Sequence, residues 1–198
     1  MPKELSLEYL IVVGRFEPPA APELNRALAA AGLGAFEYTA AAARADGAPS
    51  TGGRVRLGTY ATMVPALQGT ARLLVARYDE AVTAGMGEAA FAQLVLGLGA
   101  TEVRTLREGA IALDLRVTAP EERGWAALKW ATRVVGVLLE LSLGVCIDPA
   151  AQRALAQAGL ARLRADDPLA HVAFHDEAWD PESRWLHTHG LQKLGRPE

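Results

Sequence analysis

The chain has 198 residues, of which 51% are hydrophobic and 22% charged, and its formal net charge is -3. This composition is that of an ordinary globular protein with one sizeable core. The small negative charge argues against nucleic acid or an anionic membrane as a partner.

Three further features predict a soluble protein of the cytoplasm. The single cysteine, Cys146, excludes an internal disulfide, and its apolar neighbours predict a buried, unreactive thiol. The N-terminus carries acidic residues where a signal peptide has basic ones. The most apolar segment, residues 125–147, contains Lys129, Arg133 and Glu140, which favours a buried helix over a membrane span.

In the first half of the chain, β-branched and alternating apolar runs predict strands, and segments bounded by proline and glycine predict helices. The run at 69–76 fits either a strand or a helix. In chain order we expect a strand at 7–13, a helix at 22–31, a loop at about 40–53, a strand at 55–63, the run at 69–76, a helix at 88–98 and a strand at 102–106.

In the second half, two helix starts are indicated by capping residues. Thr118 and Glu121 match a capping box, and Asp148 followed by Pro149 is typical of a helix N-terminus. In chain order we expect a strand at 111–117, a helix from 118 to 143, a strand at 145–147, a helix from 148 to 163, and strands at 169–175 and 184–189 joined by an acidic segment.

This order predicts an α+β protein with helices packed on a largely antiparallel sheet. The first half matches the ferredoxin-like pattern β-α-β-β-α-β. We expect a single domain over residues 1–198, with 1–108 and 109–198 as possible halves. The 23-residue span at 125–147 should supply the most buried helix, because it is apolar over most of its circumference.

All four histidines fall within one short stretch near the C-terminus, among several acidic residues. His187 and His189 are two residues apart, so on a strand they would share one face about 7 Å apart and could bind one ion. His171 and His175 would be about 13 Å apart on a strand and could not both bind it. The candidate metal ligands are therefore His187, His189 and His175, with zinc as the candidate ion. Hairpin register decides whether they meet.

Other kinds of chemistry find less support in the sequence. The acidic residues between 166 and 182 could contain a general acid–base pair, although a solvated acidic loop explains them as well. A phosphate-binding glycine-rich loop and a Walker-type lysine are both missing. Trp125 and Trp130 could line a ligand pocket or simply fill the core. No other cofactor is indicated.

The end of the chain carries the string Trp185-Leu-His-Thr-His-Gly-Leu-Gln-Lys-Leu-Gly-Arg-Pro-Glu198. It resembles the ending of an uncharacterised bacterial domain-of-unknown-function family, in which Trp-x-His-Thr-His-Gly-Leu is followed by Gly-x-Pro-Glu-Leu-Glu. We call residues 185–198 the terminal motif. The family has no established activity, but related domains are suspected as immunity or accessory proteins in bacterial conflict systems. This chain stops at Pro-Glu, so we expect its C-terminus to be truncated.

Three hypotheses follow for the function. The resemblance favours an accessory protein, of immunity type, that acts by binding a partner protein and is not an enzyme. The first alternative is a metal-dependent hydrolase that uses His187 and His189 with His175 or an acidic residue of the following loop. The second is a small-ligand sensor. The oligomeric state, the partner and the substrate have no signal in the sequence.

Overall fold

The structure is a computed structural model that describes residues 3–15, 17–40, 53–162, 167–178 and 184–194. The side chains at 161–162, 174–178 and 184–187 lie outside this description. The predicted loop at 40–53 and the acidic segment after residue 178 fall mostly outside it as well. Among the described residues, no helix has the length and apolar character needed to cross a membrane.

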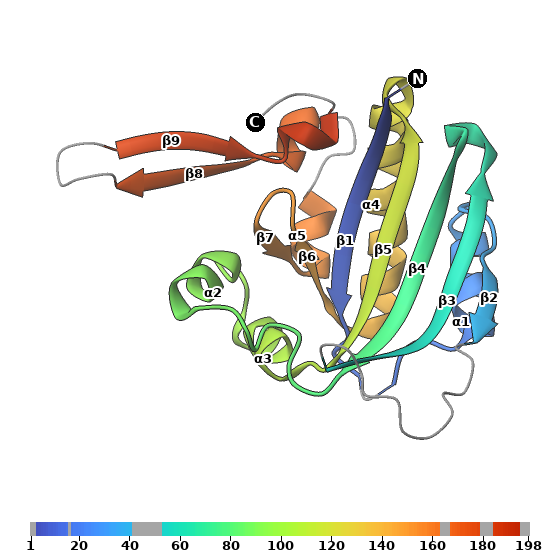
Figure 1. Cartoon of the computed structure of the whole chain (residues 1–198), viewed down its shortest axis with the longest axis horizontal. Coiled ribbons are helices and arrows are strands. Elements are labelled where there is room, and N and C mark those ends of the chain that lie inside the picture. The colour runs from blue at the N-terminus through green and yellow to red at the C-terminus, as the bar shows by residue number, and fades with distance from the viewer. Residues whose placement is uncertain (1–2, 16, 41–52, 163–166, 179–183, 195–198) are drawn as a thin grey trace.

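The fold is α+β, as predicted, and its centre is an antiparallel sheet of seven strands. The order across the sheet is β2-β3-β4-β5-β1-β6-β7, and each neighbouring pair is antiparallel (Figure 1). The strands are β1 (Glu4–Val12), β2 (Glu37–Ala40), β3 (Arg54–Val64), β4 (Gly69–Tyr78), β5 (Ile111–Pro120), β6 (Val145–Asp148) and β7 (Arg153–Leu155). A separate sheet of two strands contains β8 (Ala173–Ala178) and β9 (Arg184–His189).

β1 is an interior strand of the sheet, next to the middle strand β5, and its side chains alternate between buried and exposed along most of its length. Leu5, Leu7, Tyr9 and Ile11 are buried, whereas the residues between them in the first part of the strand are exposed. Because successive side chains point to opposite faces, this alternation gives the strand one core face. The strand pairs with β5 on one side and β6 on the other.

This pairing leaves the ferredoxin-like first half unconfirmed. Both neighbours of β1 come from the part of the chain after residue 108, so one sheet combines strands from the two possible halves. The run at 69–76, for which the sequence left two choices, is the strand β4.

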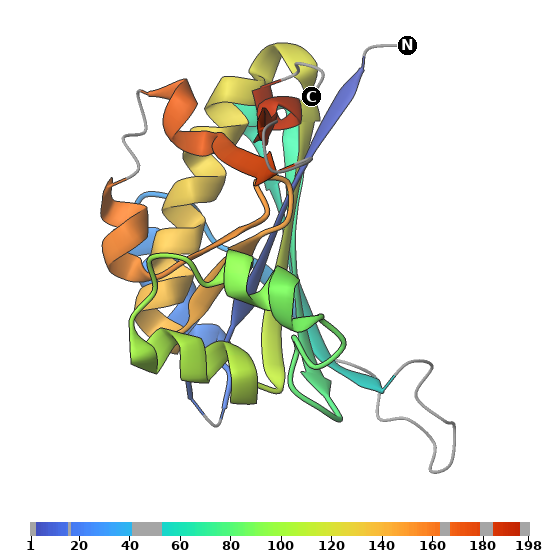
Figure 2. The ribbon, with the colours of Figure 1, turned by 90° about the vertical axis from the view of Figure 1, so that its left-hand side faces the viewer.

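The main helical layer covers one face of the sheet. α4 (Gly124–Ser142) packs along β1 and β5, with α1 (Ala21–Ala30) and α5 (Gln157–Arg162) beside it (Figure 2). Leu128, Val135 and Leu138 of α4 have no exposed surface. The prediction that this apolar segment forms a buried helix is therefore confirmed.

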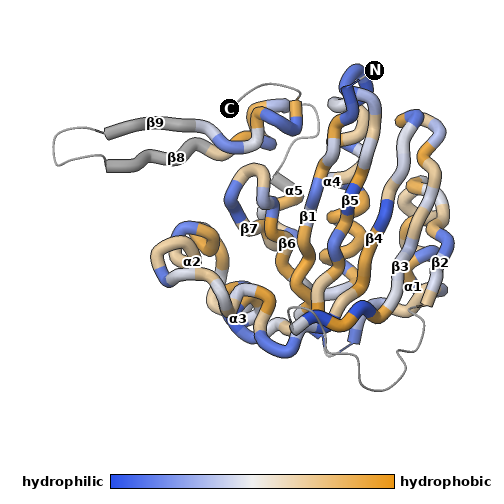
Figure 3. The backbone as a smooth tube through the Cα atoms, in the orientation of Figure 1, coloured by the Kyte–Doolittle hydropathy of each residue, from blue (hydrophilic) through white to orange (hydrophobic). Residues whose placement is uncertain are grey.

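A second, smaller core lies on the other face at the β6 end of the sheet. Val12, Val145 and Ile147 have the opposite parity to the main-core residues and pack with Phe91 and Leu106. These last two come from α2 (Glu88–Leu94) and α3 (Ala100–Glu108). Elsewhere this face carries polar residues, as the hydrophilic stretches along β1, β4 and β5 in Figure 3 show.

Four predictions about individual elements are wrong in ways that matter for the site. Residues 102–106 belong to the helix α3, because Val103 and Leu106 are spaced for one helical face and pack in the second core. Thr118 lies in β5 and its hydroxyl contacts that of Thr70 at 2.7 Å, so it caps no helix. The predicted helix at 148–163 is β7 followed by α5. The predicted strand at 169–175 begins instead with a 3-10 turn, η3 (Pro168–His171).

Candidate functional site

The four histidines are divided between two environments. His171 ends η3 and is 1% exposed. His175 stands in β8, whereas His187 and His189 stand in β9. The register places His175 opposite His187, and His189 opposite Ala173.

This register bears directly on the predicted metal ligands. Positions 175, 187 and 189 share one parity of the hairpin, so the slip that would have separated them does not occur. The side chains of His175 and His187 lie outside the described part of the structure. Within the part that is described, no group of three histidine, cysteine, aspartate or glutamate side chains could hold a metal ion.

The terminal motif begins within β9, and after β9 the chain turns sharply at Gly190 toward the seven-stranded sheet. Gly190 has a φ of +104°, a conformation that L side chains rarely adopt. The chain then forms the 3-10 turn η4 (Leu191–Leu194), where the Lys193 amide donates to the Gly190 carbonyl over 3.1 Å. η4 packs against β1 and α4.

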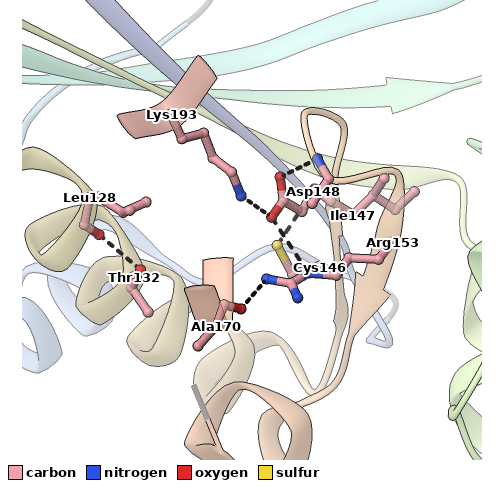
Figure 4. A network of polar contacts seen from close by, with 9 residues as sticks. Leu128, Thr132, Cys146, Ile147, Asp148, Arg153, Ala170 and Lys193 are labelled. Carbon is pink, nitrogen blue, oxygen red and sulfur yellow. Dashed lines mark hydrogen bonds and ion pairs between the residues drawn. The ribbon is translucent and has the colours of Figure 1, made fainter. Parts of the chain in front are cut away.

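Lys193 is the centre of a buried polar cluster. Its side chain is 2% exposed, and its Nζ lies 2.6 Å from Oδ2 of Asp148, whose side chain is 1% exposed (Figure 4). The other carboxylate oxygen of Asp148 accepts from the Ala151 amide over 3.2 Å. The Lys193 ammonium also lies 5.9 Å from the ring centre of Tyr9. The hydrogen bond between Lys193 and Asp148 therefore links η4 to β6, a strand that begins 48 residues before Lys193.

Arg153 links this cluster to η3. One of its terminal nitrogens donates to the Ala170 carbonyl over 2.9 Å. Its Nε lies 3.8 Å from Asp148 Oδ2, close enough for an ion pair but too far for a hydrogen bond. That Nε and the Nε2 of His171 are both buried and have no hydrogen-bond partner among the described residues.

The electrostatics of the cluster follow from burial. Burial, followed by the charges of Lys193 and Arg153, lowers the pKa of His171 to about 4, so its imidazole is neutral at pH 7. Burial also lowers the pKa of Lys193, while the charge and hydrogen bond of Asp148 act against that shift. Cys146 is buried, as predicted, and burial together with the negative charge of Asp148 raises the pKa of its thiol.

This geometry makes the cluster a structural anchor and argues against a catalytic role for Lys193. A catalytic lysine must present its amine to a substrate, but the Lys193 ammonium is enclosed and hydrogen-bonded to Asp148. The anchor fixes η4 and η3, and these two turns lie at the base of the β8–β9 hairpin. The residues that the cluster adds to the sequence-based candidates are Lys193, Asp148 and Arg153.

Sequence reasoning missed Lys193 and Asp148, although one signal was present. The chain has three lysines, Lys3, Lys129 and Lys193, among 20 basic residues. Lys193 is the one lysine of the three that lies in the terminal motif. Asp148 carried a different signal, because an acid before proline is also typical of a helix cap.

The two tryptophans considered as pocket residues both pack against the main core. Trp130 stacks on Phe36 with ring centres 6.2 Å apart. The Trp125 ring meets His171 edge to face at 5.7 Å, which helps to enclose the imidazole. Both contacts favour the core-filling role over a ligand pocket.

Comparison of the chain with protein-family models, with curated proteins and with solved structures finds no match. The functional argument therefore rests on the geometry of this molecule.

Gly190→Ala is expected to lower the free energy of unfolding by about 1–3 kcal/mol. An added Cβ would lie 2.7 Å from the His171 carbonyl oxygen, in addition to the unfavourable φ. Gly34→Ala is the matched control, because Gly34 has a φ of +83° but nothing within 4 Å of an added Cβ. Denaturant unfolding should show a larger loss for position 190. Equal losses would mean that η3 and the terminal motif are not in close contact there.

Proposed function

We propose that the protein acts by binding a partner protein, and that the β8–β9 hairpin is the element that it presents. The observation that carries this proposal is the position of the hairpin, which projects from the seven-stranded sheet as an arm (Figure 1). The resemblance of the terminal motif to a bacterial family with suspected immunity or accessory members supports the same conclusion.

The arm has open edges in the described part of the structure. β8 and β9 pair only with each other, and no third strand joins them there. A strand edge offers unpaired N–H and C=O groups that can pair with a strand of another protein. Two strands alone are marginally stable in water, so such an arm gains most from a partner that covers it.

The base of the arm is tied to the body of the protein on both sides. Gly190, η4 and the Asp148–Lys193 pair follow β9, while η3 with the buried His171 precedes β8. Both ends of the hairpin are therefore tied to the same buried cluster. A fixed base with projecting strands reduces the ordering cost of binding, because the arm is already oriented.

Site-specific photo-crosslinking in the cells that produce the protein tests this proposal. A photoreactive residue in place of Ala178, in β8, is expected to give one discrete protein adduct. The same replacement at Ala29, an exposed residue of α1, should not give it. Loss of the adduct at position 178, or identical adducts at both positions, would contradict the proposal. An adduct formed by the purified chain alone would show that the partner is a second copy.

A metal-binding hairpin is the second candidate, and the register favours it specifically. The register pairs position 175 of β8 directly with position 187 of β9. Position 189 has the same parity on β9. Three imidazole positions so arranged match the ligand type of zinc, whose further ligand in a hydrolase would be water or substrate.

Elemental analysis of the purified protein separates the two candidates. If the hairpin binds metal, we expect a stoichiometric amount of zinc in the wild type and its loss in the His187→Ala/His189→Ala variant. Equal zinc contents in the two proteins would contradict the metal site. The crosslinking result does not depend on this outcome.

A further inference from the structure

We propose that a pocket at the opposite end of the sheet from η4 binds a small phosphate ester. The pocket has a volume of about 680 Å³ and lies where β1 ends, β4 ends and α3 leads into β5. That volume is within the range of about 300–1,000 Å³ typical of small-molecule sites. The inference is independent of the proposed role of the β8–β9 arm, because no residue of the arm lines this pocket.

Three arginines from separate elements line the pocket. Arg15 follows β1, Arg77 stands near the end of β4 opposite Ile111, and Arg104 lies on α3 (Figure 1). Glu108 is the one acidic residue in the lining. The pocket therefore has an excess of positive charge in a chain whose net charge is -3.

None of these three arginines has a carboxylate partner within the described part of the structure, in contrast to Arg116 and Arg107. Arg116 pairs with Glu8 at 2.7 Å, and Arg107 pairs with Glu88 at 3.3 Å. No ion pair of this kind involves Arg15, Arg77 or Arg104. Their guanidinium groups are thus available to an external anion.

The chemistry of the lining selects the class of anion. A guanidinium donates two parallel hydrogen bonds to a phosphate, and several arginines can share the three terminal oxygens of a phosphate monoester. Thr101 lies one helical turn before Thr105 on α3 and adds a hydroxyl to the same wall. A single carboxylate would leave part of this donor set unused.

Apolar residues line the same pocket and indicate that the ligand has an organic part. Val13, Ile111 and Leu143 contribute to the lining. Leu143 is 66% exposed although it is a large apolar residue, and it occupies the left-handed position that ends α4. The backbone comes close here, since a Cβ on Gly14 would lie 2.2 Å from the Leu143 carbonyl oxygen. Phosphate recognition beside an exposed apolar surface fits an ester better than free phosphate.

Calorimetric titration with inorganic phosphate and with phenyl phosphate tests the proposal on the full chain. We expect both to bind, and phenyl phosphate to bind more tightly because its ring can contact the apolar residues of the lining. Arg77→Gln and Arg104→Gln should each weaken binding about tenfold, which is the effect of one lost charge-assisted hydrogen bond. Arg72→Gln is the matched control, because Arg72 is an exposed arginine of the same strand outside the pocket.

The signals of the arginine Nε–Hε groups in a ¹H–¹⁵N correlation spectrum give a second readout that does not depend on heat. Those of Arg77 and Arg104 should shift on titration, whereas that of Arg72 should not. Absence of binding by both compounds would overturn the proposal. Equal weakening by Arg72→Gln would also overturn it, as would phenyl phosphate binding no more tightly than inorganic phosphate.

Discussion

Lys193→Met is expected to lower the free energy of unfolding by about 3–5 kcal/mol, because it leaves the buried Asp148 carboxylate without its closest cation. Arg153 remains at 3.8 Å but makes no hydrogen bond with Asp148, so it replaces only part of the lost interaction. Methionine keeps the approximate volume of the lysine stem, and the loss therefore reports on charge more than on packing. Denaturant unfolding followed by circular dichroism measures the change.

A double variant distinguishes an uncompensated charge from a general loss of packing. Asp148→Leu/Lys193→Met removes both charges, and we expect it to recover much of the stability lost in the single variant. Arg116→Met provides the surface control, since the exposed Arg116–Glu8 pair should contribute less than about 1 kcal/mol. If Lys193→Met cost no more than Arg116→Met, the Asp148–Lys193 pair would not be an anchor.

Stability should also fall as the pH is lowered from about 6.5 toward 4, and His171 is the expected cause. Its pKa is about 4 in the folded protein and about 6.5 in an unfolded chain. Between these values the unfolded chain binds the proton and the folded protein does not, so acid favours unfolding. The full difference corresponds to about 3 kcal/mol, which is present above the upper value and lost by the lower one.

His171→Phe isolates this contribution from that of the acidic residues. Phenylalanine keeps a ring against Trp125 but has no titrating group. We expect the free energy of unfolding of the variant to depend less on pH between 4 and 6.5 than that of the wild type. Identical pH profiles would show that the His171 imidazole is not held neutral by its surroundings.

The sequence was most informative where one segment determines its own structure. The 125–147 segment is apolar over most of its circumference and therefore predicted a buried helix, and α4 confirms it, with only a narrow stripe that includes Arg133 and Glu140 left exposed. β1 could be predicted for a similar reason, since its β-branched run continues into Val12, which is buried by a second core on the opposite face.

The anchor could not be predicted, because its parts are distant in sequence. Asp148 and Lys193 are 45 residues apart, and their pairing depends on the sheet order and on the turn at Gly190. Local chemistry favoured a helix cap at Asp148, and tertiary contacts override it. Residues 102–106 are a second case in which tertiary packing overrides local sequence preference. Val103 and Thr105 favour a strand, whereas the packing of Leu106 against the second core selects a helix.

The candidate metal ligands were predicted from their spacing in the sequence. Spacing alone does not determine which of the histidines lie opposite each other. Register between β8 and β9 determines which histidines face each other, and it depends on where the hairpin is anchored. The expected strand from 169 to 175 would have kept His171 with His175. Because η3 ends at His171, that imidazole joins the buried cluster and leaves the hairpin histidines as a separate set.

Lysine acetylation of the native protein, followed by mass spectrometry, tests most directly whether Lys193 anchors the terminal motif. Lys3 is exposed and Lys129 is half-buried, so both should be modified, whereas Lys193 at 2% exposure should remain unmodified until the protein unfolds. A lysine with a lowered pKa that was open to solvent would instead react first. Modification of Lys193 at least as fast as that of Lys3 would contradict the buried Asp148–Lys193 anchor and with it the fixed base of the arm.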